Sequence, residues 1–78
     1  MLISKLSAIL SDSYYNAPDK QVALSIHMFG IKFVDELKGQ SIAEICEMAN
    51  VPKSYGTEIR KGMKIAKYVV LKDLGTGE

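Results

Sequence analysis

The chain has little of the chemistry on which most enzymes and secreted domains depend. Its 78 residues include one cysteine and one histidine. A single cysteine excludes an internal disulfide and a multi-cysteine metal site, and it is consistent with a reducing, cytoplasmic environment. The apolar runs fall far below the roughly 20 residues that cross a bilayer, so we expect no membrane contact. Polar residues also interrupt the N-terminal apolar stretch, which excludes a signal-peptide pattern.

Catalysis and cofactor binding find no support in the remaining polar residues. His27 has no Asp or Glu three or four residues away on its own helix, so we expect a structural histidine with one hydrogen bond. Cys46 is expected to face a neighbouring helix as a small apolar side chain. Glu44 and Glu47 share a helix surface, but no histidine accompanies them as a metal ligand. The sequence therefore predicts no enzyme, no metal and no cofactor.

The first half of the chain predicts a helical scaffold. One apolar stripe marks a helix that ends near Ser13–Asn16, and it comprises Leu2, Ile3, Leu6, Ile9 and Leu10. Pro18 and Asp19 suit the start of a second, long helix that Gly39 ends. The stripe of this helix comprises Val22, Ile26, Phe29, Phe33 and Leu37, widened by Leu24, Ile31 and Val34. Gly30 is expected to mark the place where another helix crosses closely.

The segment from Gln40 to Lys61 has the signals of two short helices joined by a turn. Ser41 and Glu44 form a capping box that begins the first helix. Asn50 suits the left-handed conformation that ends it. Val51 precedes Pro52, which disfavours a helical Val51, and Pro52 suits the first position of the following helix.

This stretch resembles the helix-turn-helix of DNA-binding proteins, over about residues 41–61. Cys46 stands at the small position of the first helix, Asn50 at the turn glycine, and Val51 at the apolar residue that follows it. Ile59 stands at the late apolar position of the recognition helix. Gly56 departs from the pattern, which usually has Val or Ile there. The whole resembles small regulators of phages and other mobile elements.

The charge distribution agrees with this resemblance. The net charge is only +1, but six of the ten basic residues lie between Val51 and Lys72, with Glu58 as the one acidic residue among them. Such a basic segment is the footprint expected for phosphate contacts, although a solvated helix face would have the same composition.

The resemblance implies a set of DNA contacts. The outward positions of the recognition helix are Lys53, Ser54, Tyr55, Thr57, Glu58 and Lys61, with Arg60 and Lys64 on the flank for phosphate anchoring. Gln40 and Ser41 can donate to a phosphate at the start of the preceding helix. Two alternatives stay open: Tyr55 packs over the turn instead, or Glu58 pairs with Lys61 in a surface contact.

The end of the chain allows two structures. Apolar spacing favours one helix from Pro52 to about Leu71, whereas Val69 and Val70 favour a strand over Lys67–Lys72. The apolar residues beyond those a four-helix core needs are Tyr68, Val69 and Leu71, which contact a second copy or join the core. Residues 75–78 are expected to form a flexible tail.

We therefore expect a compact all-α, four-helix domain over residues 1–74. Its predicted function is sequence-specific binding of double-stranded DNA, as a homodimeric, cytoplasmic transcriptional regulator. The alternatives are a helical protein-interaction module and an antitoxin-like protein that binds both DNA and protein.

Overall fold

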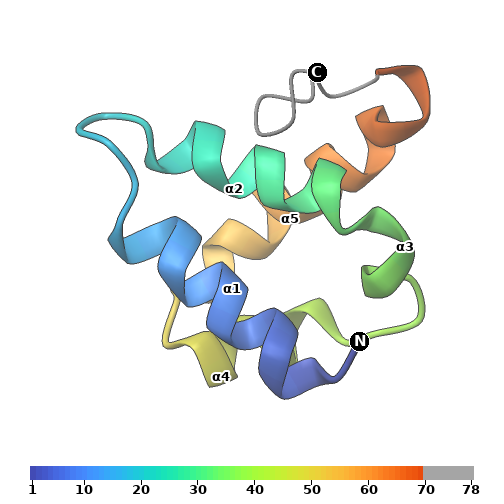
Figure 1. Cartoon of the computed structure of the whole chain (residues 1–78), viewed down its shortest axis with the longest axis horizontal. Coiled ribbons are helices and arrows are strands. Elements are labelled where there is room, and N and C mark those ends of the chain that lie inside the picture. The colour runs from blue at the N-terminus through green and yellow to red at the C-terminus, as the bar shows by residue number, and fades with distance from the viewer. Residues whose placement is uncertain (70–78) are drawn as a thin grey trace, which may run out of the picture.

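The chain folds from helical segments alone in the part that the computed structural model describes, residues 1–69 (Figure 1). Four helices have eight residues or more, and one is a single short turn. In chain order they are α1 (Ile3–Tyr15), α2 (Val22–Lys32), α3 (Val34–Leu37), α4 (Ile42–Ala49) and α5 (Gly56–Ile65). Two 3-10 helices flank α5, namely η1 (Lys53–Tyr55) and η2 (Ala66–Tyr68). The predicted all-α, four-helix class is confirmed.

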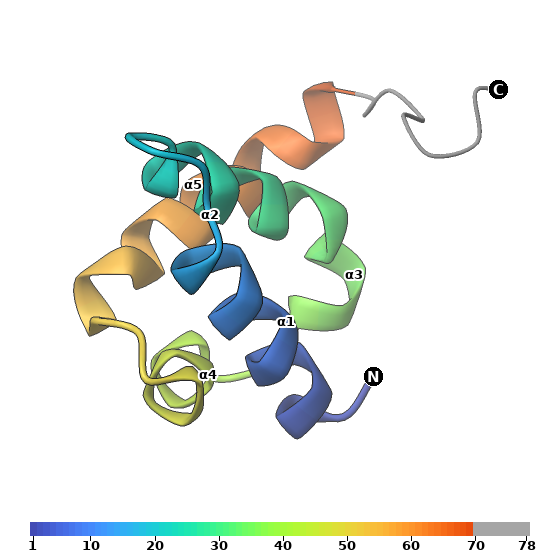
Figure 2. The same ribbon diagram turned by 60° about the vertical axis from the view of Figure 1, so that its left-hand side comes forward.

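One core joins all five helices. α1 packs on both α2 and α4, and α2 lies along α5 (Figures 1 and 2). Full burial of a large aliphatic or aromatic side chain stabilises a fold by about 1.5–3 kcal/mol. The core side chains are Leu6, Leu10, Ile26, Phe29, Leu37, Ile42, Ile45, Cys46, Ala49, Val51 and Ile59.

The first helix agrees with its predicted boundaries. α1 ends at Tyr15, and the amide of Asn16 donates to the carbonyl of Asp12 to close the last turn. Leu6 and Leu10 are fully buried, whereas Leu2 is 76% exposed and precedes the helix. The predicted stripe is thus the core face of α1, except for its first residue.

The second helix is shorter than predicted, and both ends need correction. Pro18 does not begin a helix, because Lys20 adopts a left-handed φ of 63° and the amide of Gln21 donates to the carbonyl of Pro18. The first helical residue is Val22. At the other end Phe33 leaves the helical region, with φ −111° and ψ 25°, so the final turn becomes the separate helix α3. A one-residue break keeps Leu37 pointing into the core, which is why the apolar spacing continued unchanged across it.

Gly30 lies at a helix crossing, as its position predicted. A Cβ atom added to Gly30 would lie 2.4 Å from the carbonyl oxygen of Ile59 and 3.2 Å from the Cα of Gly62. Real Cβ atoms do not approach a backbone so closely. The backbones of α2 and α5 are therefore in direct contact, and this contact fixes how α5 lies on the scaffold.

The C-terminal segment follows the helical alternative in part. Lys67 and Tyr68 belong to η2, so a strand beginning at Lys67 is wrong. The predicted single helix from Pro52 to about Leu71 is also wrong at both ends. Pro52 has an extended ψ of 135° and caps η1 instead of taking the first helical position, and Val69 is extended, at φ −130° and ψ 155°, so the helical segment ends at Tyr68. Predictions for Val70–Lys72 and for the tail 75–78 lie outside the described residues.

Candidate nucleic-acid interface

The first helix of the pair, α4, begins at the predicted cap. The hydroxyl of Ser41 accepts a hydrogen bond from the backbone amide of Glu44 at 3.2 Å, which satisfies one of the unpaired amides of the first turn. Gln40 and Ser41 are both exposed at this end. They are therefore available to an external anion at the positive end of a helix.

The turn after α4 has the conformation that its residues predicted. Asn50 lies in the left-handed region, at φ 59° and ψ 41°. The amide of Val51 donates to the carbonyl of Cys46 at 2.9 Å, and this bond closes the end of the helix. Val51 is itself buried, at 4% exposure, and anchors the turn in the core. The chain direction between α4 and η1 is therefore fixed by local chemistry.

Cys46 and Ile59 hold α5 against the rest of the domain. Both side chains are fully buried, as expected for the positions that they share with the helix-turn-helix pattern. Burial raises the pKa of the Cys46 thiol, and the nearby positive charge of Arg60 opposes this effect. A buried, protonated thiol is a poor nucleophile, so the thiol acts as a packing group.

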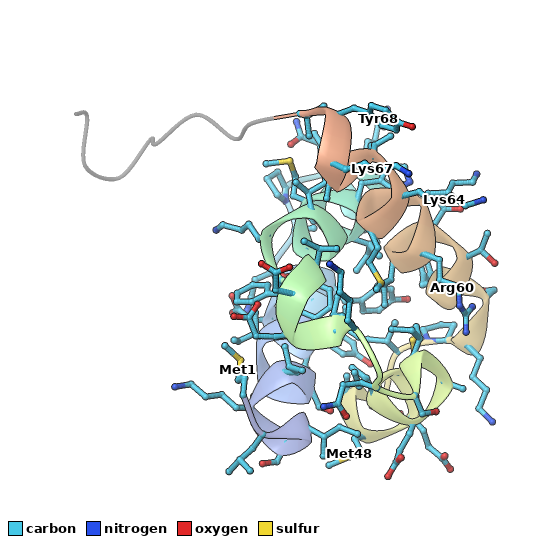
Figure 3. All side chains as sticks on the ribbon, turned by 90° about the vertical axis from the view of Figure 1, so that its right-hand side faces the viewer. Met1, Met48, Arg60, Lys64, Lys67 and Tyr68 are labelled. Atoms are coloured by element: carbon cyan, nitrogen blue, oxygen red, sulfur yellow. The ribbon has the colours of Figure 1, made fainter. Side chains whose placement is uncertain are left out.

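The opposite face of α5 is exposed and basic. Figure 3 shows Arg60, Lys64 and Lys67 in succession along the outer edge of α5 and η2. All the predicted contact residues are exposed except Tyr55 and Glu58. The exposed set is Gln40, Ser41, Lys53, Ser54, Thr57, Arg60, Lys61 and Lys64. These side chains come from the start of α4, from η1 and from α5, and α4 and α5 are the two helices that the turn joins.

Tyr55 follows the packing alternative. Its ring is half-buried and meets the ring of Tyr14 edge-on, with centroids 5.2 Å apart. Tyr14 in turn meets Tyr15 edge-on at 4.8 Å, and the Tyr15 hydroxyl donates to the backbone carbonyl of Asn50. The end of α1 therefore supports the turn. Sequence reasoning missed this role, because it treated Ser13–Asn16 as a polar helix end.

Glu58 is turned toward the scaffold. One of its carboxylate oxygens lies 2.5 Å from Nε2 of His27 on α2, and the other lies 3.8 Å from the ammonium group of Lys61. The side chain is only 26% exposed. The predicted pair with Lys61 is therefore present. Helical spacing could not predict the partner of His27, because it lies 31 residues away in the sequence on another helix.

The described residues contain few features of other kinds of site. Within residues 1–69, no group of three or more His, Cys, Asp or Glu side chains is placed to hold a metal ion. Of the helices in this part of the chain, none is long and apolar enough to cross a membrane.

Comparison with known proteins agrees with the geometry. The profile of a family described as an HTH-like domain, where HTH stands for helix-turn-helix, matches residues 2–72. The match covers both the scaffold helices and the α4–α5 pair. No curated protein and no solved structure matches the chain significantly.

Proposed function

Because the chain belongs to the HTH-like domain family, we propose that it binds double-stranded DNA in a sequence-specific manner and regulates transcription. The observation that carries this proposal is the exposed basic face of α5, held at a fixed angle to α4 by the Asn50–Val51 turn. A helix presented in this way fits the major groove, which admits one α-helix.

The positions of the exposed side chains support separate roles, with some contacting bases and others contacting phosphates. Thr57 and Lys61 lie one turn apart on the solvent face of α5, where they can reach base edges. Lys53 and Ser54 lie at the leading end of this helix, in η1. Arg60 and Lys64 lie on the flank and suit phosphate oxygens, which position a protein on DNA without reading its sequence.

Glu58 has a different role in this proposal. Because His27 and Lys61 hold its carboxylate, we assign it to fixing the orientation of α5 on α2. We therefore propose no contact between Glu58 and a cytosine. Tyr55 similarly supports the turn through Tyr14 and leaves base contacts to its neighbours.

We further propose that the protein acts in the cytoplasm as a homodimer. The apolar residues at the end of α5 and after it remain exposed: Ile65 at 44%, Tyr68 at 75% and Val69 at 43%. A second copy packed there would bury them and would present two copies of α5 to one duplex. Recognition helices in such dimers bind half-sites about 34 Å apart.

A protein-interaction module is the second candidate, and exposed apolar side chains away from Tyr68 favour it. Met1 and Met48 lie at the end of the domain opposite Tyr68 (Figure 3), and Leu2 is 76% exposed. An antitoxin-like protein would use this end for its protein partner and α5 for DNA. A pure interaction module would leave the basic face of α5 without a purpose.

Fluorescence anisotropy with a generic duplex at several salt concentrations tests the proposal. We expect dissociation constants of about 10⁻⁴–10⁻⁶ M that rise steeply with salt, as phosphate contacts require. Lys61→Ala and Arg60→Ala should weaken binding, and Lys5→Ala, on the exposed surface of α1, is the matched control. Absence of binding at low salt would refute the proposal.

A further inference from the structure

A shallow depression of about 280 Å³ lies between α3 and α5, beside the predicted DNA-contacting face. Its floor is Val34 and Met63, and its surface is almost entirely apolar. Its rim consists of three cations, Lys38, Arg60 and Lys64. Lys38 was not among the predicted contacts, because it follows α3 in a segment where the sequence shows one isolated lysine.

The rim continues toward the start of α4. A Cβ atom added to Gly56 would lie 3.3 Å from Nη1 of Arg60 and 3.5 Å from a methyl group of Ile42. The guanidinium of Arg60 therefore lies over Gly56, next to the first turn of α4. The exposed Ser41 cap precedes this turn. Arg60 therefore lies between the first turn of α4 and the depression, which it lines together with Lys38 and Lys64.

The combination of an apolar floor and a cationic rim indicates which kind of molecule binds in the depression. One strand of a duplex offers anionic phosphates on a ribbon of apolar deoxyribose faces, which is the complementary arrangement. The depression is too small and shallow to bury a partner helix. Two of its three cations, Arg60 and Lys64, are moreover already on the face proposed to contact DNA.

Lys38 is free to leave its present contact. Its ammonium group lies 3.4 Å from a carboxylate oxygen of Asp35, and the two side chains are 69% and 84% exposed. Exposed ion pairs of this kind contribute little to stability. Asp35 competes with a phosphate for Lys38, so its charge opposes the proposed contact.

We propose that this depression seats one sugar–phosphate strand of the duplex, with Lys38 as a phosphate contact that joins α3 to the DNA interface. The inference rests on the proposed DNA binding and adds a docking strand to it. The strand lies over Val34 and Met63, and the phosphates on either side pair with Lys38, Arg60 and Lys64. α3, which has only four residues, thereby gains a function beyond closing the core.

The test measures the slope of log K against log salt concentration for the full-length protein on a generic duplex. Each lost phosphate contact reduces the magnitude of this slope by about 0.9. We expect that reduction for Lys38→Ala and no reduction for Lys5→Ala, which removes the same charge from α1. Thermal unfolding of both variants verifies that the fold is retained.

Asp35→Asn supplies the decisive control. It breaks the same ion pair as Lys38→Ala but leaves the cation in place. We expect Asp35→Asn to bind DNA more tightly than the wild type with an undiminished slope. A merely structural role of the Asp35–Lys38 pair would make the two variants behave alike.

Two failures are distinguishable. If the wild type does not bind DNA, both the proposed function and this inference are refuted. Suppose instead that the wild type binds DNA and Lys61→Ala weakens binding, but Lys38→Ala has the same salt slope as Lys5→Ala. The proposed strand site in the depression would then be refuted, while DNA binding would stand. The depression would then be assigned to another anionic partner, such as an acidic peptide.

Discussion

Gly30 and Gly62 meet at the crossing of α2 and α5, where the backbone of the other helix leaves neither residue room for a side chain. A Cβ atom added to Gly62 would lie 2.4 Å from the carbonyl oxygen of His27 and 3.1 Å from the Cα of Gly30. The distances from Gly30 to α5 are equally short. The pair therefore sets the closest approach between the scaffold and the helix proposed to enter the DNA groove.

Replacing Gly62 with Ala should destabilise the domain by at least about 2 kcal/mol. The new methyl group meets backbone atoms that cannot rotate away, and overpacking of this kind typically costs about 1–3 kcal/mol or more. Urea denaturation followed by circular dichroism measures the change. A stability equal to that of the wild type would show that the two helices can separate freely.

Gly56→Ala is the matched control in the same helix, and we expect it to stabilise the domain, whereas Gly62→Ala destabilises it. Its added Cβ meets the flexible end of Arg60 at 3.3 Å and a methyl group of Ile42 at 3.5 Å, and the backbone φ of −57° suits any residue. Removing a glycine from a helix gains about 0.5–1 kcal/mol. In the same experiment, the urea concentration at the unfolding midpoint should be higher for Gly56→Ala than for the wild type.

The left-handed conformation of Asn50 predicts that two substitutions at this position differ in stability. Asn50→Gly should leave stability within about 0.5 kcal/mol of the wild type, because glycine adopts a left-handed φ without strain. Asn50→Ala should cost about 1–2 kcal/mol, because alanine has a Cβ atom as asparagine does but lacks the short polar side chain that lets asparagine adopt the left-handed conformation. Equal unfolding midpoints for the two variants would mean that the turn does not depend on the left-handed residue.

Local chemistry decides several of the features that the sequence predicted correctly. Ser41, Asn50 and Val51 act through hydrogen bonds and backbone angles within a few residues of themselves. The break at Phe33 was missed because it leaves the apolar spacing in phase. The support of the turn by Tyr15 joins residues 35 positions apart, and no helical periodicity reports such a contact.

The His27–Glu58 contact should couple α2 to α5 energetically. We expect Glu58→Ala and His27→Ala each to destabilise the domain, and the double variant to lose less than the sum of the two. The coupling energy should be about 1 kcal/mol, as for a hydrogen bond in a half-buried site. A double-mutant cycle in urea at constant pH measures it, and strict additivity would mean that the contact contributes nothing.

Cys46 predicts a pH dependence with a definite sign. Burial raises the pKa of the folded thiol above its ordinary value, with Arg60 as the smaller, opposing influence. The thiol of the unfolded chain ionises first as the pH rises, which favours unfolding. The contribution of Cys46 to stability is therefore complete below the unfolded pKa and is lost as the pH rises through the folded one. Urea denaturation from pH 7 to pH 10 should show a steeper decline for the wild type than for Cys46→Ala, in which the other titrating groups are unchanged. Parallel profiles would mean that the thiol titrates alike in both states, and reaction with a thiol reagent only after unfolding would independently establish its burial.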